Sequence, residues 1–189
     1  MNNYLKEIQQ VLRANSSERD KAFFQRVVPG KQKTYGVKAP VLNVIARRYK
    51  EGGFELARDL WQSGALEEKL IAIKITERIG RTDPRRLLRM FRLFSKQIDN
   101  WAVCDGLGMQ FLRGIVKTHR VEIFEIAKKL NRSRDPWRRR LSLVMVEWYT
   151  REAQAHDDIN ALVKNLENDQ ENYVKKAVSW IKRNLKSRK

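Results

Sequence analysis

The sequence contains very little cysteine and histidine. Cys104 is the single cysteine among 189 residues, and His119 and His156 are the two histidines. One cysteine excludes an intramolecular disulfide, and two distant histidines outside any ligand-spaced motif do not predict a metal site. We therefore expect no metal and no cofactor. A reducing, cytoplasmic location fits this composition best, in contact with the nucleoid if the source is bacterial.

Long apolar runs are also missing. No run approaches the ~20 residues that span a bilayer. The first residues, MNNYLKEIQQVLRAN, contain no apolar segment of the kind found in signal peptides. We therefore expect no membrane partner.

Acidic residues are scarce beside basic ones. There are 22 Asp and Glu against 40 Lys and Arg, which gives a formal net charge of +18. Such an excess indicates a polyanionic partner, most commonly nucleic acid, with an anionic membrane surface as the competing interpretation. Because no membrane signal accompanies it, the charge predicts nucleic acid as the partner.

Glycine and proline are few, at nine and four, and strand-like alternation is nearly absent. Apolar residues recur at helical spacing instead, which predicts an all-α fold. Residues 28–37 are expected to be non-helical, and Ser17, Asp83 and Asp135 to cap helices. The expected helices cover residues 5–12, 17–27, 38–50, 54–62, 67–79, 84–95, 99–113, 119–130, 136–150, 156–166 and 171–186.

Three aromatic residues mark an internal repeat. Trp101, Trp137 and Tyr173 follow one another at intervals of 36 residues, and the same interval sets the basic pair 139–140 against 175–176. A tiled unit of this length is typical of an α-solenoid of HEAT-like helical repeats. We therefore expect a single HEAT-like repeat domain over 1–189. Its equivalent positions would gather aromatics and cations in a basic concave groove.

Three pairs of chemically interesting residues each share one helix face: Trp101 with Asp105, Trp137 with Arg140, and Lys176 with Trp180. Each pair also has a purely structural interpretation. In the same order, these are a core tryptophan beside a solvated carboxylate, a capped helix start with a solvated basic face, and a terminal helix whose tryptophan covers the core.

Three consecutive arginines in the first turn of a helix oppose its macrodipole. A phosphate bound at that terminus would reverse the effect. The residues expected to bind DNA are Trp137, Arg138, Arg139, Arg140, Lys175 and Lys176.

Four segments, taken in order, resemble the AlkD-like DNA alkylation-repair family of HEAT-like-repeat DNA glycosylases. They are YGV…P…L…IAR (35–47), NWAVCD (100–105), PWRRRL (136–141) and KKAVSWIKR (175–183). The resemblance covers roughly residues 20–186. It implies a monofunctional hydrolase that excises positively charged N3- and N7-alkylated purines from alkylated double-stranded DNA in base-excision repair.

The resemblance also implies roles for single residues. Asp105 matches the catalytic carboxylate, Trp101 and Trp180 match tryptophans that contact the deoxyribose, and Arg140 matches an arginine at a nearby phosphate. The chemistry agrees with these residue types. A cationic base leaves without a general acid, and a carboxylate and indole faces stabilise the oxocarbenium-like sugar.

The sequence departs from the family pattern at two positions. Ala102 stands where many relatives carry Asp, and Val27 where some carry an aromatic residue. These departures leave open a non-catalytic HEAT-like protein that recognises damaged or branched DNA. A protein-docking scaffold would explain the fold but not the charge. Nothing in the sequence predicts an oligomer, so we expect a monomer.

Overall fold

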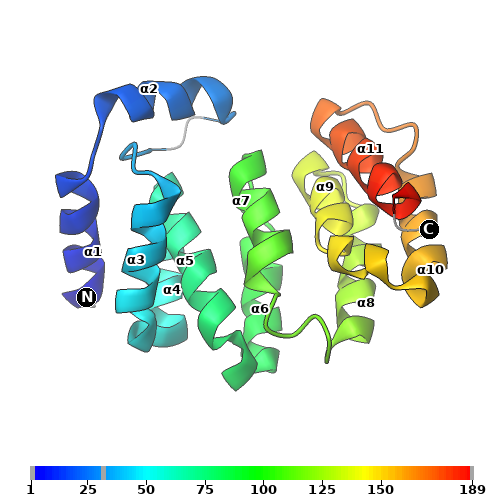
Figure 1. Ribbon diagram of the computed structural model, residues 1–189, viewed down its shortest axis with the longest axis horizontal. Helices are drawn as coiled ribbons and strands as arrows, with labels where there is room; N and C mark the ends of the chain where they lie inside the picture. Colours follow the sequence, from blue (N-terminus) through cyan, green and yellow to red (C-terminus); the bar gives the residue numbers. More distant parts are fainter. Residues whose placement is uncertain (1–2, 31–32, 188–189) are drawn as a thin grey trace. The chain divides into compact units, whose positions relative to one another are not determined.

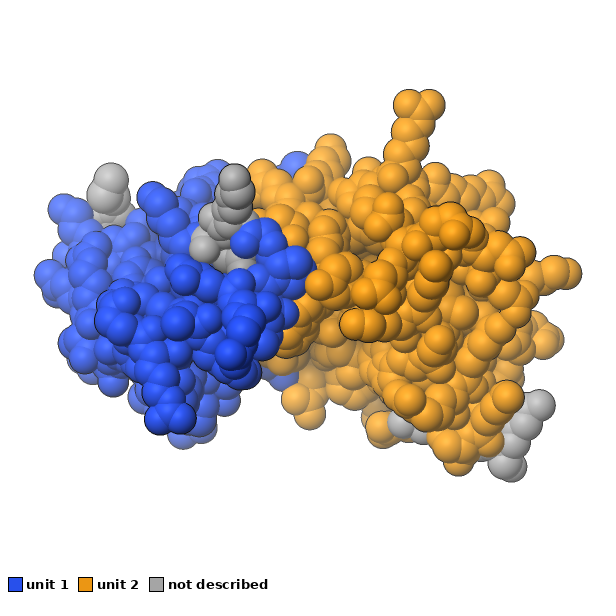
Figure 2. Space-filling model, turned by 90° about the horizontal axis from the view of Figure 1, so that it is seen from above, with its two compact units in different colours: residues 1–94 blue, residues 95–189 orange. Residues whose placement is uncertain are grey.

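The computed structural model describes residues 3–30 and 33–187 as helices joined by short connections (Figure 1). No strand occurs in these described ranges, so the all-α prediction is confirmed. No helix within them combines the length and apolar character needed to cross a membrane. The chain divides into two compact units, residues 1–94 and 95–189 (Figure 2), and each is taken by itself below.

Unit 1 (residues 1–94) is a group of helices around a core formed mainly by α4 and α5. Its elements are α1 (Asn3–Ala14), α2 (Glu18–Val27), α3 (Ala39–Arg48), η1 (Lys50–Gly52), α4 (Gly53–Ser63), α5 (Leu66–Ile79), η2 (Gly80–Thr82) and α6 (Pro84–Phe94). Buried Trp61 of α4 stacks on Phe94 of α6, with ring centroids 4.0 Å apart and planes 4° from parallel. Ser17 and Asp83 accept backbone N–H groups at the starts of α2 and α6, which confirms both predicted caps.

The non-helical segment before α3 is held by one buried carboxylate. Glu67, in the first turn of α5, accepts the Thr34 hydroxyl at 2.7 Å and the backbone N–H groups of residues 35–37 at 2.8–3.1 Å. Gly36 has φ +72°, and a Cβ there would lie 2.4 Å from the Ser17 carbonyl oxygen, so only glycine fits. The described part of 28–37 is non-helical, as predicted, and residues 31–32 lie outside the described ranges.

Unit 2 (residues 95–189) is built around α9, which packs against α7, α8 and α11. Its elements are α7 (Trp101–Gly106), the π-helical segment η3 (Leu107–Phe111), α8 (Arg120–Asn131), α9 (Pro136–Val144), η4 (Glu147–Arg151), η5 (Ala153–Ala155), α10 (His156–Asn165) and α11 (Asn172–Lys186). The helices α7, α9 and α11 start at, or one residue before, the three aromatics of the 36-residue repeat. A HEAT-like solenoid, and a single domain over 1–189, remain predictions.

Two predicted helices of unit 2 are wrong in extent. The helix expected over 99–113 is α-helical only over α7 and continues as the π-helical η3, and the one expected over 136–150 leaves the α conformation after Val144. Both departures lie where η3 and the C-terminal end of α9 approach each other closely. A Cβ on Gly108 would come within 2.5 Å of Val144 Cγ1 and 3.0 Å of the Met145 nitrogen. The backbones therefore meet where a regular pair of helices with side chains would not fit.

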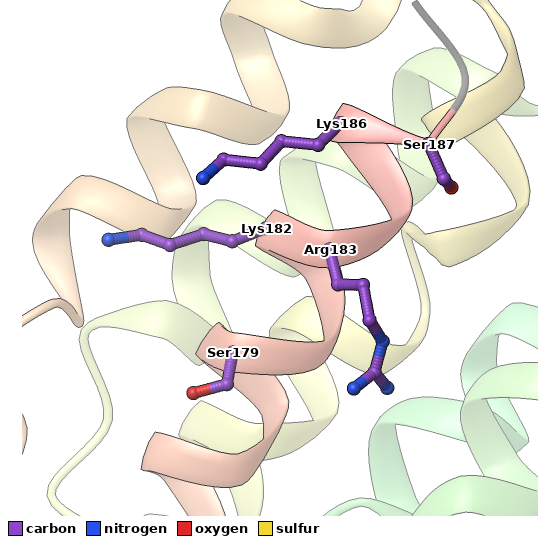
Figure 3. A pocket seen from close by; sticks show the side chains of 5 residues that line it. All are labelled: Ser179, Lys182, Arg183, Lys186 and Ser187. Carbon is purple, nitrogen blue, oxygen red and sulfur yellow. The ribbon is translucent and has the colours of Figure 1, made fainter.

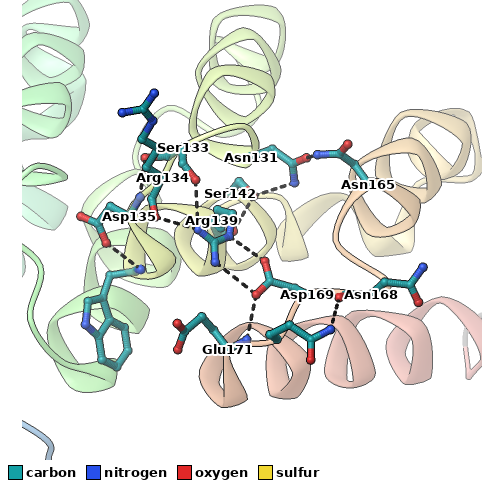
Figure 4. A network of polar contacts seen from close by, with 12 residues as sticks. Asn131, Ser133, Arg134, Asp135, Arg139, Ser142, Asn165, Asn168, Asp169 and Glu171 are labelled. Carbon is teal, nitrogen blue, oxygen red and sulfur yellow. Dashed lines mark hydrogen bonds and ion pairs between the residues drawn. The ribbon is translucent and has the colours of Figure 1, made fainter.

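Two asparagine side chains, buried Asn131 and exposed Asn165, join three helices of unit 2. The Asn131 amide, at the end of α8, donates to the Ser142 hydroxyl of α9 at 2.9 Å and to the Leu162 carbonyl of α10 at 3.2 Å. Asn165, at the end of α10, donates in turn to the Asn131 side-chain oxygen at 2.7 Å (Figure 4). Because a buried polar group costs free energy when unpaired, this set fixes how α8, α9 and α10 pack.

Candidate active site and nucleic-acid interface

The carboxylate singled out by sequence, Asp105, lies on the short helix α7. Asn100 caps this helix by accepting the Val103 backbone N–H at 2.9 Å. Val103 and Cys104 face the core, whereas Trp101 and Asp105 are both only partly buried. The indole and the carboxylate therefore share the more exposed face of α7, as their i, i+4 spacing predicts.

Asp105 is held by Arg140 of α9. The Arg140 Nε–H donates to Asp105 Oδ1 at 3.0 Å and the Nη2–H to Oδ2 at 2.9 Å, while Nη1 donates to the Tyr173 carbonyl of α11 at 2.7 Å. The Asp105 side chain is 36% exposed and that of Arg140 is 10% exposed. A carboxylate offers about four lone-pair sites, so this two-bond contact leaves acceptor capacity on Asp105.

Burial alone would lower the pKa of Arg140, but the hydrogen bond and negative charge of Asp105 raise it. Arg140 was expected to contact a phosphate. That contact stays a prediction; in the free protein three N–H donors of Arg140 go to Asp105 and to the start of α11.

The single cysteine lies next to this ion pair but is unsuited to nucleophilic chemistry. Cys104 is buried, and its thiol contacts the Trp137 carbonyl at 3.6 Å. Burial, together with the negative charge of Asp105, raises the pKa of the thiol well above its ordinary value. Since the thiolate is the reactive form, Cys104 acts as a packing residue here.

The three consecutive arginines of α9 have different environments. Arg140 pairs with Asp105, and Arg139 pairs with Asp169 through Nε at 2.6 Å and Nη2 at 3.1 Å. Arg138, by contrast, has a buried Nε with no hydrogen-bond partner. Two of the three charges near the N-terminus of α9 are therefore matched by carboxylates of the protein. Arg138 is the one of the three that no carboxylate of the protein holds, and its Nη groups, not the buried Nε, are the donors that a bound anion would use.

The contact between Arg139 and Asp169 shifts the pKa of both groups. The hydrogen bond with Asp169 raises the pKa of Arg139. Burial works to raise the pKa of Asp169, but hydrogen bonds from Arg139 and from the Glu171 backbone N–H outweigh it and lower that pKa. Both groups are therefore held in their charged forms by this contact.

Two of the repeat aromatics meet in the structure. The Trp137 and Tyr173 rings lie 4.7 Å apart between centroids with planes tilted by 31°, and the Lys176 ammonium lies 5.5 Å from the Tyr173 centroid. Trp180 is two helical turns beyond Tyr173 on the same side of α11, and it is partly buried. Lys175 and Lys176 are exposed.

Cations on the second half of α11 were missed among the sequence-based candidates. Lys182, Arg183 and Lys186, with Ser179 and Ser187, line an open pocket of about 510 Å³ (Figure 3). Lys182 and Lys186 extend to one side of the helix and Arg183 to the other. Lys182 also forms an ion pair with Glu167. The signal was present in the sequence, because Lys182 and Arg183 repeat Lys175 and Lys176 after seven residues, or two turns.

The five cations Lys175, Lys176, Lys182, Arg183 and Lys186 are here called the basic face of α11. The segment Asn172–Lys186 contains no acidic residue to balance them. Within the described ranges, no three His, Cys, Asp or Glu side chains are grouped so that they could hold a metal ion. The chemistry that the site offers is thus a partly exposed carboxylate beside an indole, next to a surface suited to phosphates.

Comparison with models of protein families gives a match over residues 8–189 to the family described as DNA alkylation repair enzyme. Comparison with individually curated proteins gives no match.

Proposed function

The chain belongs to the DNA alkylation repair enzyme family, and on that premise we propose that it is a DNA glycosylase for positively charged N3- and N7-alkylated purines in duplex DNA. Membership makes alkylation repair its role and DNA its partner. The observation that carries the more specific proposal is the Asp105 carboxylate. It is partly exposed, shares a helix face with Trp101, and is oriented by Arg140.

The proposed reaction is hydrolysis of the N-glycosidic bond. The C1′–N bond breaks and its electron pair neutralises the positive charge of the alkylated base, which leaves without protonation. Positive charge develops on the sugar, and a carboxylate close to it stabilises that charge. A water oxygen then bonds to C1′ and its proton passes to Asp105 or to solvent, which leaves an abasic site and a neutral base.

Each site residue has a distinct part in this proposal. Asp105 stabilises the sugar cation with the acceptor capacity that Arg140 leaves unused. Trp101 and Trp180 supply indole faces, which attract a cation. Arg140 acts as a positioning residue, since its planar guanidinium fixes the plane of the carboxylate through two parallel hydrogen bonds.

The DNA backbone is proposed to lie along α9 and α11. Trp137, Arg138, Lys175 and Lys176 carry the contact, and the remaining cations of the basic face extend it. All of these residues belong to one unit of one chain, which supports action as a monomer.

The direct test is release of 7-methylguanine from a methylated duplex under single-turnover conditions. We expect release by the wild type and a loss of roughly 10²- to 10³-fold in Asp105→Asn, as is typical when one preorganised electrostatic group is removed. Asn keeps one oxygen for Arg140 but loses the second acceptor and the negative charge, so thermal stability is measured alongside the rate to show that the variant is folded. Duplex affinity should change little, because Asp105 is not among the proposed phosphate contacts. Asp158→Asn is the matched control, because it removes a half-exposed carboxylate of α10 that pairs with Lys128, and it should leave the rate unchanged.

One specific observation favours a second candidate function, DNA recognition without catalysis. Arg140 already offsets the charge of Asp105, as in an ordinary structural ion pair. A non-catalytic protein that recognises damaged or branched DNA would bind the duplex tightly, with a strong salt dependence. It would release no more base as wild type than as Asp105→Asn, and that result would exclude the glycosylase.

A further inference from the structure

Arg139 and Asp169 form the centre of a polar network between two inter-helix connections (Figure 4). The Arg139 side chain is 18% exposed and that of Asp169 is 7% exposed. Besides its two bonds to Asp169, Arg139 donates through Nη1 to the carbonyls of Ser133 at 3.1 Å and Arg134 at 2.9 Å. Four of the five guanidinium N–H donors are therefore used within the protein.

The same network reaches the start of α11. Asp169 Oδ1 accepts the backbone N–H of Glu171, the residue that precedes α11, at 2.9 Å. Two residues further on, the Tyr173 carbonyl accepts Nη1 of Arg140 at 2.7 Å. Arg140 in turn holds both oxygens of Asp105. Asp169 and Arg140 thus hold the same short stretch of backbone at the start of α11, residues 171–173, and Arg140 joins that stretch to Asp105.

We propose that Arg139 and Asp169 are positioning residues for Asp105, acting through the Tyr173 carbonyl and Arg140, and that Arg139 is not a phosphate ligand. The inference rests on the proposed glycosylase function for its kinetic consequence. Its structural basis is independent of that function, because the contacts exist in the free protein. Asp169 carries the proposal most clearly, since a nearly buried carboxylate offers nothing to a DNA phosphate.

The two possible roles of Arg139 predict effects of Asp169→Asn on different quantities, the duplex affinity in one case and the rate of base release in the other. If Arg139 is a phosphate ligand, removing Asp169 frees it and tightens duplex binding. If Arg139 is a positioning residue, the start of α11 loosens, Arg140 loses its exact place, and base release slows. Small misplacements of a catalytic group cost on the order of 10- to 100-fold in rate.

The experiment measures the duplex Kd and the single-turnover rate of 7-methylguanine release for Asp169→Asn and Glu171→Gln. The second variant removes one exposed negative charge two residues away and keeps the backbone N–H that Asp169 accepts. We expect Asp169→Asn to release base at least tenfold more slowly than Glu171→Gln, with Kd equal within about twofold. Tighter binding by Asp169→Asn with an unchanged rate would overturn the proposal.

Arg139→Lys tests the same contact from the other side, with the positive charge at position 139 retained. It keeps the positive charge that a phosphate contact needs, but an ammonium cannot pair with Asp169 in parallel and reach two carbonyls at once. We expect the same slow release with unchanged duplex affinity. A wild-type rate in Arg139→Lys would contradict the positioning role.

A measurement that does not depend on base release tests this proposal separately from the proposed glycosylase function. The Nε–H signal of Arg140 in ¹⁵N NMR reports its bond to Asp105, and Asp105→Asn gives the reference for its loss. We expect Asp169→Asn to shift the Arg140 signal toward that reference and to speed its exchange with water, in a variant whose remaining amide signals show that it is folded. An unchanged signal would overturn the proposal. Should the wild type release no base, the glycosylase fails and this signal alone decides whether Arg139 and Asp169 position Asp105.

Discussion

Three adjacent residues of α9 show how strongly the environment decides the role of an arginine. Arg138, Arg139 and Arg140 are chemically identical and lie in the first turns of one helix. Asp169 and Asp105 come from two other segments and pair with the second and third. Each carboxylate also reduces the unfavourable interaction of its arginine with the N-terminal end of the helix dipole. Arg138 lacks such a carboxylate, and its Nε is buried without a partner.

This difference predicts that Arg138 contributes to DNA affinity. Replacing it in Arg138→Gln removes one phosphate contact, so the slope of log K against log salt should become shallower by about 0.9. Fluorescence anisotropy of a labelled duplex over a salt series measures the slope. Lys164→Gln, which removes one exposed charge from α10, is the control and should leave the slope unchanged. Equal slopes for Arg138→Gln and wild type would show that Arg138 contacts no phosphate.

At the scale of the element, α11 combines two functions on one helix. Its first turn supplies the Tyr173 carbonyl that Arg140 holds, and its exposed side carries the basic face. Cations repeated after two turns are spaced by about 10 Å along the axis. A regular spacing of this kind suits a polymer of phosphates better than a single small anion.

The second half of α11 should therefore bind the duplex away from the reacting base. The triple variant Lys182→Gln, Arg183→Gln, Lys186→Gln should raise Kd and reduce the salt slope by 2 to 3, at about 0.9 per lost contact. Base release at saturating protein should stay near the wild-type rate, because Asp105 and its partners are unchanged. The control variant Lys117→Gln, Lys129→Gln, Lys164→Gln removes the same charge from other exposed positions. An equal loss of slope in both triple variants would mean that only net charge matters.

The elements also show where sequence is informative and where it is not. Helical spacing and capping residues predicted nearly every helix, because both signals are local. The π-helical η3 could not be predicted, since it depends on how closely Gly108 approaches Val144 in space. The i, i+4 spacing placed Trp101 and Asp105 on one face. It could not reveal Asp169, which lies in an irregular connection thirty residues from Arg139.

At the scale of the whole molecule, the formal net charge of +18 is the property that sequence alone established most directly. Family membership now gives that charge its partner, DNA. Local pairing then decides how much of the charge is available. In unit 2 the arginines that sequence placed at the DNA are partly used to hold carboxylates. Among the residues proposed to contact the duplex, Arg138 and the basic face of α11 carry the cations that no buried carboxylate holds; the partner of Lys182, Glu167, is half exposed.

These six cations set a quantitative expectation for the intact protein. If each contacts one phosphate, log K for duplex binding should fall against log salt with a slope of about −5, since each contact contributes about −0.9. A slope near −7 would require about two further contacts from cations outside this set. Anisotropy titrations of an undamaged duplex between 50 and 200 mM salt, roughly the range in which such binding weakens steeply, measure this slope. A flat dependence would contradict backbone binding by the basic face, because displacement of counterions from the phosphates is unavoidable when cations replace them.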